Sequence, residues 1–340
     1  MTAAVLAVDG GNSKTDVALI GTDGTLLGLS RGPGSCHQSI GVEATMRVLA
    51  ELVAVAAAEA GLDPAGPVAR HGAFYLAGAD LPVEIAMLEK RLTDMGWTTD
   101  VVVDNDTFAL LRAGTESPDR VAVVCGAGIN CVGVSASGGV ARFPSLGRVS
   151  GDWGGGGQLG SEALWLAVRA EDGRGRPTAL RRAVPDHFGL ATVAEVSAAF
   201  HLGDLPAARV HELTPVLLRC AGAGDEVSGA VVERMAEEVV LLATVALGRL
   251  RLLDRPAELV LGGGVLAARD PLLLGSVEAK VRERAPQVEI RVVDRPPVVG
   301  AALLGMDALG ASPAAEARLR KALLERTGSV ALGRPGRVDE

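Results

Sequence analysis

Three glycine-rich turns, each directly after a short aliphatic strand, hold the residues of this chain whose types and spacing could do chemistry. The turns span 9–15, 126–128 and 262–264. Glycine tolerates positive φ and has no side chain, so the backbone N–H groups of such turns can converge on an anion. Three of them in one chain predict a cradle for a polyphosphate, and ATP is the ligand we expect. The predicted nucleotide contacts are Asp9, Gly10, Gly11, Asn12, Ser13, Lys14, Thr15, Gly126, Ala127, Gly128, Gly262, Gly263 and Gly264.

The first turn differs from a P-loop. A P-loop follows the pattern GxxxxGK[ST] and leads into a helix, whereas here Ser13 precedes Lys14 and a strand follows. A β-hairpin whose turn amides and hydroxyls face phosphate could also bind and neutralise that phosphate. Asp9, at the end of the first strand, would place a carboxylate where Mg²⁺ is held through its waters. A plain tight turn is the alternative for a lone hairpin, and the second turn at 126–128 favours nucleotide binding.

Two acidic segments could act on a second substrate. Asp104-Asn-Asp106 lies at the end of a predicted strand and is followed by helix-compatible residues. Acidic residues at such a position often cap a helix, but a carboxylate at this edge can instead accept a hydroxyl proton. The residues alone leave both interpretations open. Residues 147–157 are too rich in glycine for a helix or strand, so Asp152 is predicted on a loop that approaches a ligand or acts as a hinge.

The elements that must position these residues form two similar halves. Residues 4–30 read as three strands joined by glycine-containing turns, and residues 120–144 repeat that layout. Helices and parallel-type strands follow each three-stranded meander, which indicates an α/β fold. We therefore predict two related halves that meet across a cleft. The stretch 171–188 is predicted to be a surface loop, and 328–340 a frayed, disordered tail.

Length, charge and cysteine content exclude several classes of protein. The 340 residues favour two domains over one core, and the net charge of −8 argues against nucleic-acid or polybasic membrane-surface partners. No apolar run reaches the roughly 20 residues of a membrane span, and no signal peptide is expected at the N-terminus. The cysteines at 36, 125, 131 and 220 form no CxxC pair. We therefore expect neither a disulfide framework nor a zinc site. This cysteine usage is typical of a protein in a reducing cytoplasm, which is the location we expect.

In the order and spacing of these motifs, the chain resembles the N-acetylglucosamine kinase branch, or BadF/BadG/BcrA/BcrD-type ATPase family. That family shares the fold of sugar kinases, actin and heat-shock chaperones. The resemblance covers about 4–310. It implies two ribonuclease H-like (actin-like) domains, each a mixed β-sheet flanked by helices, with an interdomain cleft. The implied domains are 1–115 and 116–312, with a helical insertion at about 158–250.

The resemblance also implies roles for individual residues. The turn at 9–15 would be the first phosphate loop, 126–128 the second, 262–264 the adenosine motif, and Gly300-Ala301-Ala302 a connecting helix at the hinge. Asp106 falls on the family's catalytic base, which would take the proton of a sugar hydroxyl as it attacks Mg-ATP. The implied sugar contacts are Ser35, Cys36, His37, Asp80, Asp106, Asn130, Gly151 and Asp152.

Three positions depart from the family pattern. Ala127 stands where the second phosphate loop usually carries Thr, Trp153 where an acid is usual, and Cys36 where animal N-acetylglucosamine kinases have Asn. Phosphorylation of a small amino sugar remains our expectation, with N-acetylglucosamine at O6 as the first choice. ATP and Mg²⁺ are the implied cofactors, and the family resemblance suggests a homodimer.

Two other functions remain open. One is an ATPase that activates a CoA-ester dehydratase or reductase, a class in the same family that holds an iron–sulfur cluster between subunits through cysteines. Cys125 and Cys131 read here as small core residues. The other is a non-catalytic sugar sensor, which Ala127 and Trp153 favour and which the intact Asp9 and Asp106 oppose.

Overall fold

The protein divides into two compact units, one of which is built from both ends of the chain. The structure is a computed structural model, and it describes residues 2–293 and 295–331. Contacts between residues place 2–116 and 295–331 in a first unit and Ser117–Val293 in a second. In the described part of the chain, no helix is both long enough and apolar enough to cross a membrane.

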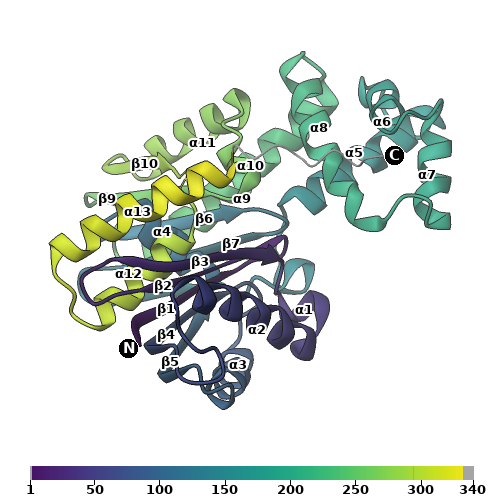
Figure 1. Cartoon of the computed structure of the whole chain (residues 1–340). Helices are drawn as coiled ribbons and strands as arrows, with labels where there is room; N and C mark the ends of the chain where they lie inside the picture. Colours follow the sequence, from purple (N-terminus) through teal and green to yellow (C-terminus); the bar gives the residue numbers. More distant parts are fainter. Residues whose placement is uncertain (1, 294, 332–340) are drawn as a thin grey trace. The chain divides into compact units, whose positions relative to one another are not determined.

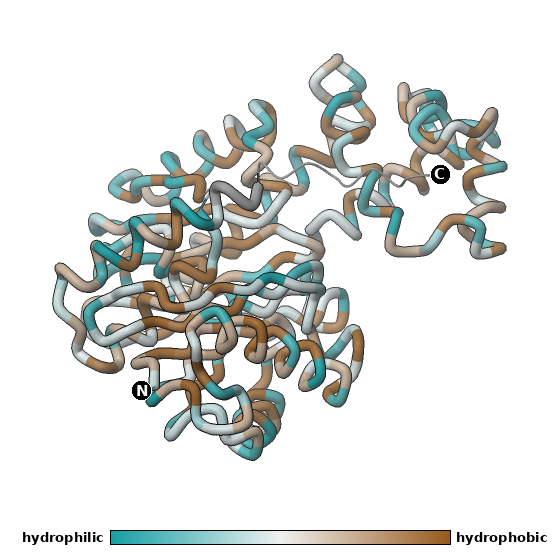
Figure 2. The backbone as a smooth tube through the Cα atoms, viewed as in Figure 1, coloured by the Kyte–Doolittle hydropathy of each residue, from teal (hydrophilic) through white to brown (hydrophobic). Residues whose placement is uncertain are grey.

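The first unit contains a five-stranded mixed sheet with the strand order β3-β2-β1-β4-β5. The first three strands form an antiparallel meander, and the last two run parallel to β1. Most of their aliphatic residues are buried, and Figure 2 shows hydrophobic residues along the strands. The strands are β1 (Ala3–Gly10), β2 (Lys14–Ile20), β3 (Leu26–Pro33), β4 (Ala69–Leu76) and β5 (Thr98–Asn105).

Helices cover both faces of this sheet (Figure 1). Successive strand residues point to opposite faces. Leu6 packs in a cluster with residues of α2 and α3, while Val5 packs in a cluster with residues of α4, α12 and α13. The helices are α1 (His37–Ile40), α2 (Val42–Glu59), α3 (Pro82–Asp94), α4 (Asp106–Gly114), α12 (Val298–Ala308) and α13 (Pro313–Ala331).

The second unit repeats the plan of the first sheet, with the order β10-β9-β6-β7-β8. Strands β6, β7 and β8 form an antiparallel meander, and β9 and β10 run parallel to β6. The duplication predicted from 4–30 and 120–144 is therefore present in the topology. The strands are β6 (Arg120–Cys125), β7 (Ile129–Val134), β8 (Val140–Arg142), β9 (Ala257–Gly262) and β10 (Val288–Val292).

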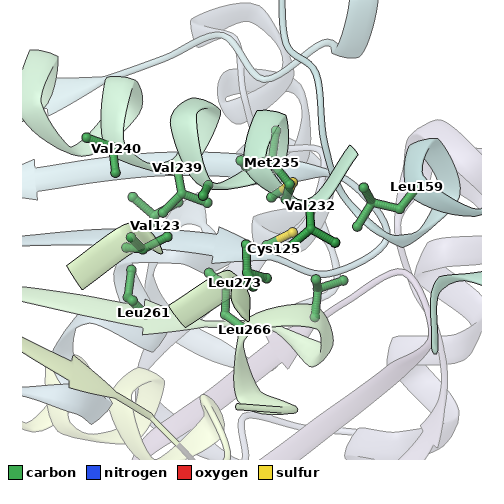
Figure 3. Close-up of a cluster of buried hydrophobic side chains, with 14 of the residues drawn as sticks. Val123, Cys125, Leu159, Val232, Met235, Val239, Val240, Leu261, Leu266 and Leu273 are labelled. Carbon is green, nitrogen blue, oxygen red and sulfur yellow. The ribbon is translucent and has the colours of Figure 1, made fainter. Parts of the chain in front are cut away.

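One large apolar cluster joins this sheet to the helices of the second unit. In Figure 3, Val123 and Cys125 of β6, Leu261 of β9, Val239 of α9 and Leu273 of α11 meet in this cluster. Helices α5, α6 and α7 extend it away from the sheet (Figure 1). The helices are α5 (Gly156–Glu171), α6 (Leu180–Phe188), α7 (Val193–Leu202), α8 (Leu213–Gly222), α9 (Glu226–Arg249), α10 (Gly264–Ala267) and α11 (Pro271–Arg284), with 3₁₀ turns at Gly147–Ser150 and Ala207–Glu212.

Three sequence-based expectations differ from the structure. The predicted loop at 171–188 contains helix α6, whose Leu180 and Val184 are buried. Residues 298–312, expected with the second domain, pack in the first unit, because the apolar α12 covers the β1 sheet. Of the predicted tail, 328–331 continue helix α13, and 332–340 lie outside the described residues.

Candidate functional site

The first glycine turn is a tight hairpin between β1 and β2. The Gly11 amide donates to the Lys14 carbonyl at 2.9 Å and closes the turn. A Cβ on Gly10 would lie 2.6 Å from Ser35 Oγ, so only glycine fits there without displacing its neighbours. Asn12, Ser13 and Lys14 are exposed, and the Lys14 ammonium has no ion pair with any described residue. The turn therefore presents a cation and a short polar run to solvent.

A row of polar side chains crosses the first sheet just before this turn. In the strand register, Asp9 lies opposite Asp16 on one side and Tyr75 on the other. Asp16 in turn lies opposite Arg31, and Tyr75 opposite Asp104. Residues directly opposite each other share a face of the sheet. Arg31 donates two hydrogen bonds to Asp16 at 2.5 and 3.0 Å, which leaves Asp9 as the inner carboxylate of the row.

Asp9 lies in a strongly negative, buried environment. Burial is the largest cause that raises the pKa of its carboxyl well above the ordinary range, followed by the charges of Asp106 and Asp16. Lys14 and Arg31 offset this only in part. A cation beside Asp9 would relieve the repulsion. Mg²⁺ fits, because it is held through one or two carboxylates, waters and substrate phosphates rather than by a full protein cage.

Asp106 begins helix α4, and its neighbour Asn105 caps that helix. The Asn105 side chain accepts a hydrogen bond from the Thr107 amide at 3.0 Å, so neither flanking acid is the cap. Asp106 remains partly exposed. Burial raises the pKa of its carboxyl to about 6, although backbone N–H groups of Thr107 and Asp106 itself lower it. A carboxylate with a pKa near neutrality suits a general base.

A hydrogen-bonded network connects Asn105, the residue before Asp106, to Gln38 in the segment after β3. Asn105 Nδ2 donates to Asp80 at 2.8 Å, and Gln38 Nε2 donates to Asp80 at 3.3 Å and to Glu84 at 2.8 Å. His37 Nε2 lies 3.6 Å from the Glu84 carboxylate. The network joins the ends of β4 and β5 to α1. Asn105, Gln38 and Glu84 were absent from the predicted site residues.

Ser35 and Cys36, two of the predicted sugar contacts, are buried at the base of this region. Thr15 Oγ1 donates to Ser35 Oγ at 2.8 Å, and the Ser35 amide donates to the Gly11 carbonyl at 3.0 Å. Cys36 immediately precedes α1. The first unit therefore brings together the predicted residues Ser35, Cys36, His37, Asp80 and Asp106 with the turn at 9–15.

In the second unit, the turn at 126–128 is held by the glycines that begin α5. The amides of Gly156 and Gly157 donate to the carbonyls of Gly126 and Ala127 at 2.7 and 3.0 Å. Gly155 has φ +87°, and a Cβ there would lie 2.4 Å from Gly128 Cα. Close backbone packing, rather than a hinge, therefore explains the glycines at the end of the 147–157 segment.

The third glycine turn, at 262–264, packs next to the turn at 126–128. Gly263 has φ +82°, and a Cβ there would lie 2.5 Å from the carbonyl carbon of Cys125 at the end of β6. Gly264 opens α10 and has free space around its Cα. The turns at 126–128 and 262–264 are thus neighbours within the second unit.

The remaining predicted sugar contacts also lie in the second unit. Asp152 Oδ2 accepts hydrogen bonds from the Gly147 amide at 3.0 Å and from Ser150 Oγ at 2.6 Å, so it orders its own loop. Gly151 is exposed with φ +85°. Asn130 is partly exposed on β7, and its Oδ1 accepts from the Cys131 amide at 2.7 Å.

The four cysteines lie in the buried part of the chain. All four of them, Cys36, Cys125, Cys131 and Cys220, are free and buried. Burial raises the pKa of the Cys125 thiol to about 12 and also raises that of Cys131. Among the described residues, no group of three His, Cys, Asp or Glu side chains is arranged to hold a metal ion. The position of Cys125 in the apolar core (Figure 3) agrees with its reading as a small core residue.

Comparisons with known proteins point to one family. Residues 6–305 match the model of the BadF/BadG/BcrA/BcrD ATPase family. The chain is 27% identical over 265 residues to an N-acetylmuramic acid/N-acetylglucosamine kinase from Clostridium acetobutylicum, covering 77% of this chain and 85% of the relative. It is 25% identical over 311 residues to an N-acetyl-D-glucosamine kinase from Dictyostelium discoideum, covering 89% and 97%.

A solved structure shows the same fold. A candidate N-acetylglucosamine kinase from Chromobacterium violaceum superposes with a TM-score of 0.71 at 23% identity, covering 89% of this chain and 99% of that one. At this identity the likeness concerns the fold. It agrees with the two mixed five-stranded sheets flanked by helices.

Proposed function

Because the chain belongs to the BadF/BadG/BcrA/BcrD ATPase family, we propose that it is a sugar kinase that transfers the γ-phosphoryl group of ATP to an amino sugar. The observation that carries the proposal is the pair of carboxylates in the first unit. Asp9 and Asp106 repel each other beside an exposed turn whose Lys14 has no ion pair with any described residue. The Asp9 carboxylate suits a hydrated cation, and the Asp106 carboxyl has a pKa of about 6, which suits a general base.

Asp106 acts as the general base in this proposal. Its carboxylate takes the proton of the sugar hydroxyl, O6 in our assignment, as that oxygen attacks the γ-phosphorus. The bond between the γ-phosphorus and the β,γ-bridging oxygen breaks, ADP leaves, and the proton stays on the carboxyl group. Phosphoryl transfer needs little covalent help, so position and charge neutralisation account for most of the catalysis.

Asp9 and Lys14 would both bring positive charge to the phosphates, Asp9 through a bound Mg²⁺ and Lys14 through its own ammonium group. Asp9 would hold Mg²⁺ through its waters, and the bound ion would neutralise negative charge on the phosphate oxygens. Lys14 adds a second positive charge from the hairpin turn. The amides of the turns at 9–15 and 126–128 are assigned to the phosphates and the turn at 262–264 to the adenosine. Ala127 offers no hydroxyl, so its turn can bind only through its backbone.

We assign N-acetylglucosamine as the first substrate, with Asn130, Asp152 and the network around Asp80 orienting it. The names of the two curated relatives support an N-acetylated amino sugar. We further assign the protein to the cytoplasm, as a homodimer. Sedimentation equilibrium of the purified chain tests the dimer.

The test is a coupled assay of ADP release with Mg-ATP and a panel of sugars. The panel comprises N-acetylglucosamine, glucosamine, N-acetylmuramic acid, N-acetylmannosamine and glucose. The highest kcat/KM is expected for N-acetylglucosamine, and its 6-deoxy analogue should accept no phosphate. Asp106→Asn serves as the matched control for contaminating kinases. Sugar-dependent ADP release with none of the panel would refute the kinase proposal.

The same experiment separates a second candidate, a non-catalytic sugar sensor. The replacement of a hydroxyl residue by Ala127 favours this candidate, because the second phosphate turn then has no side-chain donor. A sensor would bind a sugar, measured by calorimetry, and release no ADP. The activator alternative requires a protein that purifies with iron, which the burial of Cys125 and Cys131 opposes.

A further inference from the structure

A cavity of about 550 Å³ lies in the second unit, outside all the residues assigned to the sugar and the nucleotide. Its walls come from α5, from α9, from the segment 174–176 and from Trp153. Two kinds of side chain dominate the lining. Trp153 and Trp165 contribute indole rings, and Arg169, Arg174, Arg176 and Arg234 contribute guanidinium groups.

The positive charge of this cavity is only partly neutralised. Arg174 pairs with Asp172 at 2.6 Å, and Arg176 pairs with Glu226 at 2.6 Å. Arg234 instead stacks on the Trp153 ring, with its guanidinium carbon 4.0 Å from the ring centroid. It forms no ion pair with any described residue, although the charge of Glu238 on the same helix acts on it.

Arg169 is the second guanidinium of the lining that forms no ion pair with a described residue, although the charge of Asp172 acts on it. It stacks on the Trp165 ring at 4.6 Å and donates to the Arg174 carbonyl at 2.9 Å. The acidic residue of the lining is Glu162, whose Oε1 accepts a hydrogen bond from Gln158 at 3.1 Å. The lining therefore contains four guanidinium groups and one carboxylate, and Asp172 and Glu226, which are not part of the lining, pair with two of these guanidinium groups.

The indole N–H of Trp153 lacks an acceptor. Trp153 is 7% exposed, and its Nε1 has no hydrogen-bond partner among the described residues. Buried polar groups are nearly always hydrogen-bonded. The Nε1 atom is itself buried, so a molecule in the cavity would contact Trp153 through its ring and not through this N–H group.

We propose that this cavity binds a small organic anion, a carboxylate or phosphate group carried on a planar apolar body. Guanidinium groups recognise the oxygen pairs of carboxylates and phosphates through two parallel hydrogen bonds. Trp165, Leu166 and Val231 supply apolar contact surface for the rest of the molecule. The volume is within the range of small-molecule sites. The site is a second one, independent of the kinase assignment.

The three tryptophans make the proposal testable by NMR. Trp153 and Trp165 line the cavity, whereas Trp97 is buried in the first unit and serves as an internal control. Full-length protein with ¹⁵N-labelled indoles is titrated with benzoate and with phenyl phosphate. The signals of Trp153 and Trp165 should shift and saturate, while that of Trp97 stays in place. Benzyl alcohol and inorganic phosphate, which each lack one half of the ligand, should bind at least tenfold more weakly.

Substitution of the unpaired arginines checks the location. Arg234→Gln and Arg169→Gln should each weaken binding of the tighter probe by about tenfold or more, measured by calorimetry. Arg182→Gln is the matched control, because Arg182 is a strongly exposed arginine of the same unit that does not line the cavity. The proposal is overturned if neither probe gives saturable shifts, if Trp97 moves with the other two, or if Arg234→Gln binds like Arg182→Gln.

Discussion

At the scale of single residues, Asp106 combines two properties that rarely occur together. It is partly exposed, as a group that meets a substrate must be, and yet its pKa is about 6. As a base it must be ionised, so activity should fall as pH drops below about 6. We expect log kcat/KM to decline by about one for each pH unit in that acidic range. A rate profile measured at saturating Mg²⁺ checks this, and a flat profile down to about pH 4.5 would remove Asp106 as the base.

The substitution Asp106→Asn should separate chemistry from binding. It removes the proton acceptor and keeps the size of the side chain, so turnover should fall by about 10²–10⁴-fold. The nucleotide contacts assigned to the turn at 9–15 are kept, and the loss of the Asp106 charge removes a repulsion at Asp9, so Mg-ATP should bind at least as tightly. Single-turnover kinetics together with calorimetry provide the two readouts. Turnover within tenfold of the unsubstituted enzyme would contradict the assignment.

The same substitution should also stabilise the fold at neutral pH. The folded-state pKa of Asp106 is raised to about 6, so folding favours the protonated carboxyl and loses stability as pH rises through that value. Asn resembles the protonated form. The gain in free energy of unfolding should therefore be near zero at about pH 4 and about 2–3 kcal/mol at about pH 8. Urea unfolding at the two pH values measures it, and a gain that is equal at both would speak against this origin.

The individual site residues differ in how far sequence could predict them. The positions of Asp9 and Asp106 at strand ends were predictable, because a strand that ends in a carboxylate beside a glycine turn or a helix is a local pattern; their roles stay predictions. The choice of Asn105 as the cap was not, since Asp104 and Asp106 flank it with equally suitable side chains. The contacts of Gln38 with Asp80 and Glu84 join segments about 40 residues apart, and no local pattern encodes such a pairing.

At the scale of elements, helix α4 is held in place by α12 and α13. Arg112 of α4 donates to Asp307 of α12 at 2.8 Å and to Glu316 of α13 at 2.8 Å. Gly300 of α12 lies against the α4 backbone, where a Cβ would stand 1.7 Å from the Ala109 carbonyl oxygen. Asp106 is the first residue of α4, so this packing also fixes the position of the proposed base.

Substitution of Gly300 tests this helix contact. Gly300→Ala forces the two helices apart and should cost about 3 kcal/mol or more, with a loss of kcat. Gly275→Ala is the matched control, because Gly275 lies within α11 with nothing near its Cα and should gain about 0.5–1 kcal/mol in helix propensity. Thermal and urea unfolding compare the two. Equal effects would show that the contact is looser than the structure has it.

Elements with a strong local sequence pattern could be predicted, whereas helix α6 and the placement of α12 could not. The two hairpins were predictable because aliphatic runs and glycine turns alternate over a few residues. Helix α6 was missed because its buried face rests on Leu180 and Val184 within a polar stretch that also contains Pro185. The placement of α12 on the first sheet depends on a contact with β1, roughly 290 residues earlier, which composition and periodicity cannot report.

At the scale of the whole molecule, the first unit depends on the C-terminal segment. Val5, Ala7, Ala18 and Ile20 of its sheet pack against α12 and α13, so a chain ending at 293 would expose this apolar face. We expect that truncated chain to aggregate or to lose its first unit to proteolysis, while 117–293 survives as a resistant fragment. Mass spectrometry of a limited digest identifies the fragment. A truncated chain as resistant as the full-length protein would contradict this expectation.

The arrangement of the first unit also has a consequence for synthesis on the ribosome. The N-terminal sheet emerges first, but the helices that complete one of its faces leave the exit tunnel last. Residues 117–293 form a continuous unit and can finish folding before α12 and α13 are available to pack on the N-terminal sheet. Nascent chains usually fold from the N-terminus onward. Here the order should be reversed, and chaperones that shield apolar sheets should bind the nascent chain until translation ends.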